Sequence, residues 1–187
     1  MTIIFTENDE LNEELEKNIE GSRIAFYTKY LLEEKEANVA ILSVQDNKFE
    51  FEKFLFELRK RNIDVVVHLI NGLPNETKED NLETIRKIRH LDIQGIKFHS
   101  LFIEKDTRLE KLFNECNYHV LDIDEYIDIV ISQLELLPEH IVIQRLTGDP
   151  VASKLAFPLW SIKKINVLNG IDKEMVKRST FQGRLYE

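Results

Sequence analysis

The sequence predicts an α/β fold with a mostly parallel sheet, and three observations lead to this prediction. Short, almost unbroken apolar runs recur along the chain, as in strands that are covered on both faces. Segments with apolar residues three and four positions apart lie between these runs, as in amphipathic helices. The two patterns alternate, which is typical of βαβ units, in which helices join parallel strands.

These patterns place each element along the chain. The apolar runs predict strands over residues 2–6, 38–44, 64–70, 95–101 and 141–146. The helical spacing predicts helices over residues 10–19, 23–36, 51–61, 77–90, 107–115, 124–137 and 158–177. The last ten residues follow neither pattern, so we expect them to form a tail.

Polar residues mark the ends of two of these helices. Thr77 is followed three residues later by Asp80, which fits a capping box, in which each side chain accepts a hydrogen bond from the other residue's backbone. Asp122 or Asp124 can cap the helix over residues 124–137. Pro138 ends that helix, because proline cannot continue it.

The composition is that of a soluble globular protein. Of the 187 residues, 43% are hydrophobic and 32% are charged, and a chain of this length can bury a core without disulfides or metal. We expect a single domain over residues 1–187. It would comprise an acidic helical region at 1–36, alternating strands and helices at 37–149, and a C-terminal helical extension at 150–187.

Charge and hydropathy exclude several partners. The formal net charge is −9, so the field of the whole protein does not favour nucleic acid. Residues 145–187 hold eight bases and four acids, and this basic C-terminal segment can touch phosphates locally, although a solvated face is the favoured interpretation. No run approaches the roughly 20 apolar residues of a membrane span, and the first residues lack a secretion signal. We therefore expect a cytoplasmic protein with no membrane partner.

The chain has one cysteine, Cys116. This count excludes a disulfide framework, a zinc site with several cysteines and a self-contained iron–sulfur cluster, which needs three or four thiolates. His119 follows three residues later, but a Cys/His nucleophile depends on spatial proximity, so the spacing alone is a weak signal. We expect no metal site and no catalytic residue, although chemistry on Lys97 or Cys116 stays as the least favoured alternative.

Ligands of parallel α/β folds bind beyond the carboxyl ends of the strands. The loop at residues 71–77 follows one such end, and Gly72 there allows a tight turn or a close ligand. A well-made loop without a ligand is the favoured alternative. His68 is the one polar residue within an apolar strand, where a core histidine with its hydrogen bonds satisfied is the default.

Two further strand ends carry candidate residues. Lys97 and His99 share one face of their strand, and a binding site and a solvated strand end are equally good interpretations. Arg145 can clamp a carboxylate or phosphate, with Thr147 and the Gly148 backbone beside it. An internal ion pair between Arg145 and Asp149 is the competing account.

Six short runs carry a family resemblance. They occur in one order over residues 60–184, and together they are specific: HLINGLPNET at 68–77, GIKFH at 95–99, QLELLP at 133–138, RLTGD at 145–149, PLWS at 158–161 and STFQG at 179–183. They resemble the C-terminal portion of bacterial elongator-like radical S-adenosylmethionine (SAM) enzymes. The resemblance implies an incomplete TIM-like (β/α) barrel with mostly parallel strands and C-terminal helices, so that residues 37–149 would be partial barrel strands and helices.

The chain departs from that family in two ways. The family's early strands carry a CxxxCxxC loop that holds a [4Fe–4S] cluster, and the loop is missing here, so we expect no cluster on this chain alone. Within the matched part, Asn75 replaces the glycine of a usual GLPGE. Asp106 and Arg108 stand where glycine and proline are usual, and Gln144 stands where a histidine is usual.

The leading hypothesis is a truncated, cluster-less relative without radical chemistry of its own, which keeps small-molecule or SAM-type binding at the strand ends. SAM is the one cofactor that the resemblance implies. The residues expected to bind it are His68, Gly72, Lys97, His99, Arg145, Thr147 and Asp149. The alternative is an interaction or subunit protein that covers open barrel edges with a second copy of itself or with a partner polypeptide that carries the cluster.

Overall fold

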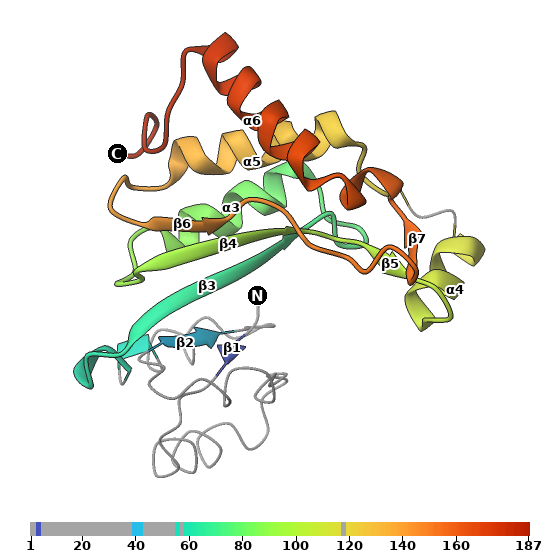
Figure 1. Ribbon diagram of the computed structural model, residues 1–187. Coiled ribbons are helices and arrows are strands. Elements are labelled where there is room, and N and C mark those ends of the chain that lie inside the picture. The colour runs from blue at the N-terminus through green and yellow to red at the C-terminus, as the bar shows by residue number, and fades with distance from the viewer. Residues whose placement is uncertain (1–2, 5–38, 43–54, 57, 117–118) are drawn as a thin grey trace. The chain divides into compact units, whose positions relative to one another are not determined.

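The computed structural model describes residues 3–4, 39–42, 55–56, 58–116 and 119–187 (Figure 1). Two predicted helices lie outside the described residues, those over 10–19 and 23–36. So does the first part of the helix predicted over 51–61. Residues 58–60 are helical, in agreement with the end of the last prediction.

One sheet has five strands in the order β1-β2-β3-β4-β6. Its strands are β1 (Ile3–Ile4), β2 (Val39–Leu42), β3 (Asp64–Asn71), β4 (Gly95–Ser100) and β6 (Val142–Arg145). β2 and β3 are parallel, whereas β1 runs antiparallel to β2. The Gln94 amide donates to Val65 O, and the Leu101 amide donates to Asn71 O, so residue numbers on β3 and β4 rise together and these strands are also parallel.

A second sheet pairs β5 (Ile103–Glu104) with β7 (Leu155–Phe157) in antiparallel fashion. The sequence prediction missed both strands, because runs of two and three residues are too short for an alternation to show. The α/β class and the parallel pairing of β2, β3 and β4 are confirmed. The closure of this sheet toward a barrel stays a prediction.

The predicted helices are confirmed in the described part of the chain. They are α3 (Lys78–Ile88), α4 (Arg108–Cys116), α5 (Ile123–Leu136), the 3-10 helix η1 (Leu159–Ile162) and α6 (Lys164–Arg178). Thr77 and Asp80 form the expected capping box at α3. Of the two candidate caps of α5, Asp122 is the one used, in a capping box with Glu125.

The chain divides into two compact units, which we describe separately. The first comprises Met1–Leu69, Leu91–Lys97 and His140–Gln144. Its described core holds apolar residues from β3, the start of β4 and the segments around them: Leu58, Val65, Val66, Val67, Leu69, Ile93 and Ile96. The Arg59 guanidinium binds the carboxylates of Asp64 and Asp92, which joins three segments of this unit.

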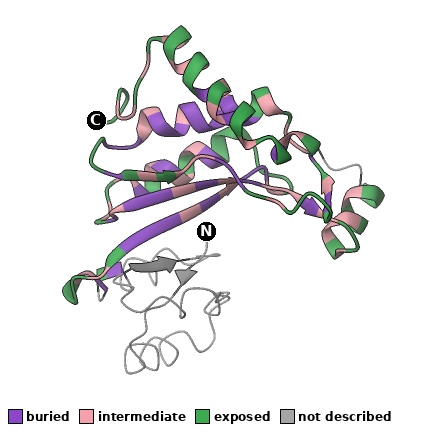
Figure 2. Ribbon diagram, in the orientation of Figure 1, coloured by how far each residue is buried: buried purple, intermediate pink, exposed green. Residues whose placement is uncertain are grey.

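The second unit comprises Ile70–His90, Phe98–Glu139 and Arg145–Glu187. Here α5 packs between α3 and α6 (Figure 1). Both neighbours cover α5, so nearly every residue from Tyr126 to Leu134 is buried, as the purple stretch of that helix shows in Figure 2. The apolar pattern of α5 therefore has more than one buried face.

The C-terminal segment after α6 does not form the predicted tail. The Gly183 amide donates to Leu134 O at 3.0 Å, and the Leu185 amide donates to Glu135 O at 2.7 Å. The Gln182 side chain donates to Pro138 O. The last carbonyls of a helix lack partners within the helix, so these bonds cap the end of α5 and fix the segment. The prediction was wrong because such pairing between distant segments leaves no periodic pattern in the sequence.

Candidate ligand site at the strand ends

The seven residues predicted to bind a ligand fall into both units. Gly72, His99, Arg145, Thr147 and Asp149 belong to the second unit, and His68 and Lys97 belong to the first. The alternation of burial along β4 places Lys97 and His99 on one face and Phe98 and Ser100 on the other, as predicted. The Nε2 atoms of His68 and His99 are buried, and neither residue is without a partner.

Gly72 follows β3 with a φ of 90°, a conformation that disfavours a side chain. A Cβ at this position would lie 2.9 Å from Leu121 Cδ1. The close approach that glycine permits here is therefore made by Leu121 of the same unit. This packing is a structural reason for the glycine.

Leu121 connects the Gly72 loop to a pair of aromatic residues. Its carbonyl accepts a hydrogen bond from Trp160 Nε1 at 2.9 Å. The Trp160 ring lies 5.3 Å from the Tyr126 ring, at a tilt of 37°. The Tyr126 hydroxyl donates to Leu146 O at 2.9 Å, directly after β6. The aromatic pair thus joins the end of β3 to the end of β6 within the second unit.

Two buried hydroxyl groups lie at the ends of β4 and β6. Ser100 and Thr147 are 3% and 0% exposed, and neither hydroxyl oxygen has a hydrogen-bond partner among the described residues. A Cβ at Gly148 would lie 3.4 Å from Ser100 Oγ and 3.3 Å from the Phe102 ring. We call Ser100, Phe102, Tyr126, Thr147 and Gly148 the strand-end cluster. A buried polar group without a partner is unusual, so these two hydroxyls single out the cluster as the candidate site.

Burial controls the ionisation of Tyr126 in this cluster. Burial raises the pKa of the Tyr126 hydroxyl well above its usual range, and the nearby Thr147 hydroxyl acts in the opposite direction. The hydroxyl therefore stays protonated and remains a donor to Leu146 O. At the other strand end, partial burial and the Asp80 carboxylate raise the pKa of Glu76.

The structure contradicts the predicted ion pair between Arg145 and Asp149, and ligand binding by these residues stays a prediction. The Asp149 carboxylate lies 3.9 Å from Lys164 Nζ, and these two described residues, Arg145 and Asp149, form no ion pair with each other. Arg145 is half-buried at the end of β6. Of the eight basic residues in 145–187, Lys164, Lys177 and Arg178 form ion pairs with acids of the second unit, which weakens the case for phosphate contacts.

Two departures from the resembled family share one backbone property. Asn75 has a φ of 66° and Asp106 a φ of 61°. Glycine is the usual residue at both positions in that family, and asparagine and aspartate are the side chains that best tolerate this left-handed conformation. The turns are therefore retained without the glycines.

The residues present do not fit an iron–sulfur cluster. The sequence holds a single cysteine, and the described residues include no group of three or more His, Cys, Asp or Glu that could hold a metal ion. In the described part of the chain, no helix is long and apolar enough to cross a membrane.

Sequence reasoning missed Ser100, Phe102, Leu121 and Tyr126 as site residues. Ser100 is the last residue of a strand whose preceding positions were considered, so its place at a carboxyl end was the available signal. Tyr126 lies on an apolar helix face and gave no signal beyond core packing. Trp160 was noted for its motif, and its role in the site becomes visible only through its bond to Leu121.

Comparisons with known proteins agree with this architecture. The Radical_SAM C-terminal domain matches residues 93–177, a range that contains the whole strand-end cluster. The uncharacterized protein YtqA of Bacillus subtilis is 37% identical over 131 residues, which are 70% of this chain and 41% of that protein. The uncharacterized protein MJ0486 of Methanocaldococcus jannaschii is 33% identical over 132 residues, again 70% and 41%.

A solved structure shares the fold. It is an archaeal Elp3 from Methanocaldococcus infernus with an N-terminal deletion, with a TM-score of 0.60 at 16% sequence identity. The match covers 71% of this chain and 31% of the other. The chain thus spans about two fifths of the length of the curated relatives that it matches.

Proposed function

We propose that this chain is a small-molecule binding module of the radical SAM family, because the Radical_SAM C-terminal domain matches its residues 93–177. It would retain a SAM-type ligand at the ends of β4 and β6. It would carry out no radical chemistry alone, because one cysteine cannot hold the cluster that delivers the electron.

The observation that carries the proposal is the pair of buried hydroxyls, Ser100 Oγ and Thr147 Oγ1. Each can donate and accept a hydrogen bond, and neither is used by the described residues. SAM offers hydroxyl, amino and carboxylate groups to such partners. SAM bound here would be a ligand and would not be cleaved, since its reductive cleavage needs the cluster's electron.

Equilibrium dialysis of the full chain with radiolabelled SAM tests the proposal. We expect saturable binding that Thr147→Val and Ser100→Ala each weaken about tenfold, the worth of one hydrogen bond. Thr147→Val keeps the side-chain volume, and its melting temperature should change little, because within the fold the hydroxyl has only its interaction with Tyr126 to lose. Ser132→Ala is the matched control, because the Ser132 hydroxyl is used within α5, where it donates to Asp128 O.

Two results would overturn this proposal. One is a folded chain that does not bind SAM at millimolar concentration. The other is binding that both hydroxyl variants leave intact. The cluster-less part of the proposal has its own test, because a stable [4Fe–4S] absorbance after anaerobic reconstitution with iron and sulfide would contradict it.

A second candidate function is that of a subunit, and the strand order favours it. β6 stands at one end of the five-stranded order, and Val142 on it is 59% exposed. An open strand edge invites pairing with another chain. The relatives have more than twice the matched length, so a separate polypeptide that resembles their remaining part is a candidate partner.

Light scattering of the full chain at micromolar concentration tests the self-paired version. Pairing through β6 predicts a dimer that Ile143→Pro dissociates. The Val142 amide donates to Gln94 O within the chain, so the next amide along the strand is the one that faces the open edge, and proline removes it. Val151→Pro, at an exposed position outside the strands, controls for the substitution itself. A monomer would dismiss self-pairing.

A further inference from the structure

An apolar ridge lies on the segment that joins β7 to α6. Its members are Leu159, Ile162 and Ile165, which are exposed to 65%, 44% and 62%. Phe157, at the end of β7, is 41% exposed, and its ring packs 4.9 Å from the ring of Phe113. In a 3-10 helix, residues three apart point the same way, so Leu159 and Ile162 share one face of η1. Ser161 beside them is buried, and Ile165 continues the ridge in the first turn of α6.

The segment that carries the ridge has a charge opposite to that of the protein as a whole, although Asp149 and Glu104 adjoin it. Residues 150–171 contain three lysines and no aspartate or glutamate, in a chain with a formal net charge of −9. Lys154 and Lys163 are exposed, and Lys164 lies 3.9 Å from Asp149. Exposed branched aliphatic side chains beside a few cations are therefore concentrated on one short segment.

We infer that the ridge is a docking surface for another polypeptide, one that presents apolar side chains among acidic ones, as an acidic amphipathic helix does. Aliphatic and aromatic anchors inside a polar rim are the anatomy of a protein interface. Two exposed lysines are fewer than the four to eight basic residues that typically recruit an anionic membrane. The charge complementarity thus selects an acidic protein segment over a lipid surface.

The ridge adjoins the strand-end cluster through Trp160. This residue lies between ridge residue Leu159 and Ser161, and its Nε1 donates to Leu121 O. A partner seated on the ridge would therefore contact the segment that positions Trp160 beside Tyr126. The inference rests on exposure and charge, and it stands whether or not the cluster binds SAM.

Fluorescence anisotropy of the full chain tests the ridge. The probe is a labelled helical peptide of 14 residues with leucine at every third or fourth position and glutamate between. We expect saturable binding that Leu159→Ser and Ile165→Ser each weaken about tenfold. Lys163→Glu should weaken binding and reduce its salt dependence. All three positions are exposed, so the melting temperatures should not change.

Matched controls distinguish docking at the ridge from non-specific hydrophobic binding. Val176→Ser removes an apolar side chain that is 79% exposed at the other end of α6, and it should leave the affinity unchanged. A peptide with lysine in place of each glutamate should not bind. Equal binding of both peptides, or loss of binding in Val176→Ser as large as in Leu159→Ser, overturns the inference. So does binding to phosphatidylserine vesicles without binding to the acidic peptide.

Discussion

The side chains of Asn71 and Gln133 form a reciprocal amide pair in the interior of the second unit. Asn71 Nδ2 donates to Gln133 Oε1 at 2.8 Å, and Gln133 Nε2 donates to Asn71 Oδ1 at 3.0 Å. Both residues are 1% exposed. Asn71 is the last residue of β3, so the pair holds the strand end that leads into Gly72 against the middle of α5.

Gln133→Leu should destabilise the protein by about 1–3 kcal/mol, because it leaves the Asn71 amide buried without its partner. Urea unfolding measures this loss. The double variant Asn71→Leu/Gln133→Leu should recover most of the stability, since two apolar side chains leave no buried amide unsatisfied. A double variant less stable than the single one would mean that the amide pair matters for more than its own hydrogen bonds.

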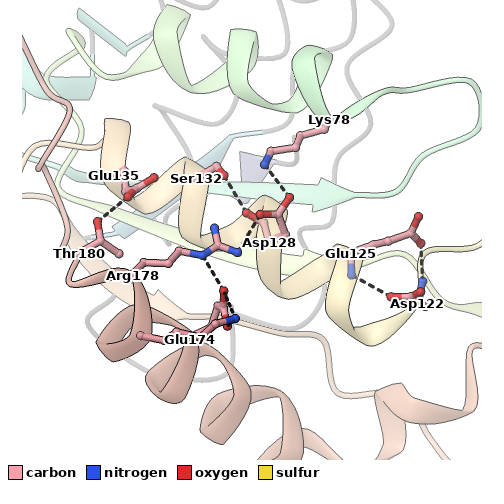
Figure 3. A network of polar contacts seen from close by, with 10 residues as sticks. Lys78, Asp122, Glu125, Asp128, Ser132, Glu135, Glu174, Arg178 and Thr180 are labelled. Carbon is pink, nitrogen blue, oxygen red and sulfur yellow. Dashed lines mark hydrogen bonds and ion pairs between the residues drawn. The ribbon is translucent and has the colours of Figure 1, made fainter.

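Asp128 ties three helices together, as Figure 3 shows. Its carboxylate binds Lys78 Nζ of α3 at 2.6 Å and Arg178 of α6 at 2.9 Å. Burial alone would raise the pKa of Asp128, but hydrogen bonds from Lys78 and Arg178 hold it below its ordinary value of 3.8. The ionised form therefore stabilises the fold above that value, and the contribution fades as the pH falls through the lowered pKa.

Asp128→Asn should accordingly cost about 1 kcal/mol at neutral pH, a modest value because these groups are partly exposed. The difference from the unsubstituted protein should shrink below about pH 4. Urea unfolding at pH 7 and pH 3 measures both values. Asp172→Asn, at an exposed position on α6, serves as the control. A difference that grows on acidification would have the wrong sign for this account.

Substitutions at Asn75 test the left-handed turn. Asn75→Val should destabilise by about 1–2 kcal/mol, because a branched side chain disfavours positive φ. Asn75→Gly should change stability by less than about 1 kcal/mol, since glycine adopts this conformation freely. Thermal unfolding measures the stability of both variants, Asn75→Val and Asn75→Gly. Asn166→Val in α6 is the control, because valine and asparagine have similar helix propensities. Equal losses at both positions would dismiss the backbone explanation.

Tyr126→Phe removes the donor to Leu146 O and should cost about 1–2 kcal/mol at pH 8. The raised pKa of Tyr126 adds a pH dependence with a definite sign. Tyr126 contributes fully to the stability of the fold at pH values below 10.0, the ordinary pKa of tyrosine. This contribution is lost as the pH rises above that value, because only the unfolded chain then ionises this tyrosine readily.

Chemical unfolding at pH 8 and pH 11 measures this dependence. The unsubstituted protein should lose more stability between the two than Tyr126→Phe does, so the gap between them narrows. Tyr186→Phe is the control, at a residue that is 39% exposed. The difference in stability between this variant and the unsubstituted protein should change far less between pH 8 and pH 11. Parallel pH curves for Tyr126→Phe and the unsubstituted protein would contradict the buried-phenol account.

The elements that sequence analysis predicted correctly have a local cause. The capping box of Thr77 and Asp80 and the apolar run of β3 are readable because the residues that define them are neighbours in the chain. Thr147 was predicted as a ligand-binding residue because the motif at residues 145–149 follows a strand, and ligands of parallel α/β folds bind at strand ends. The sequence did not reveal that Asp149 lies against Lys164, because that contact depends on how α6 packs.

Sequence analysis did not predict the residues that support the site, because their contacts also depend on tertiary packing. Leu121, Tyr126 and Trp160 lie far apart in the sequence and meet only through tertiary packing. Asn75 was interpreted as the loss of a glycine, whereas the structure shows a residue that keeps the glycine's conformation. A substitution can change the residue type and preserve the backbone, and only a φ angle distinguishes this from a lost turn.

The cap that Gly183 and Leu185 place on α5 has a consequence for hydrogen exchange. Their amide protons lie in a segment with no helix or strand, where rapid exchange with solvent would be the usual expectation. Because these protons are bonded to Leu134 O and Glu135 O, they exchange only when the segment detaches from the helix. Their protection factors would report how often α5 loses its cap, a property of a buried helix read from residues at the surface.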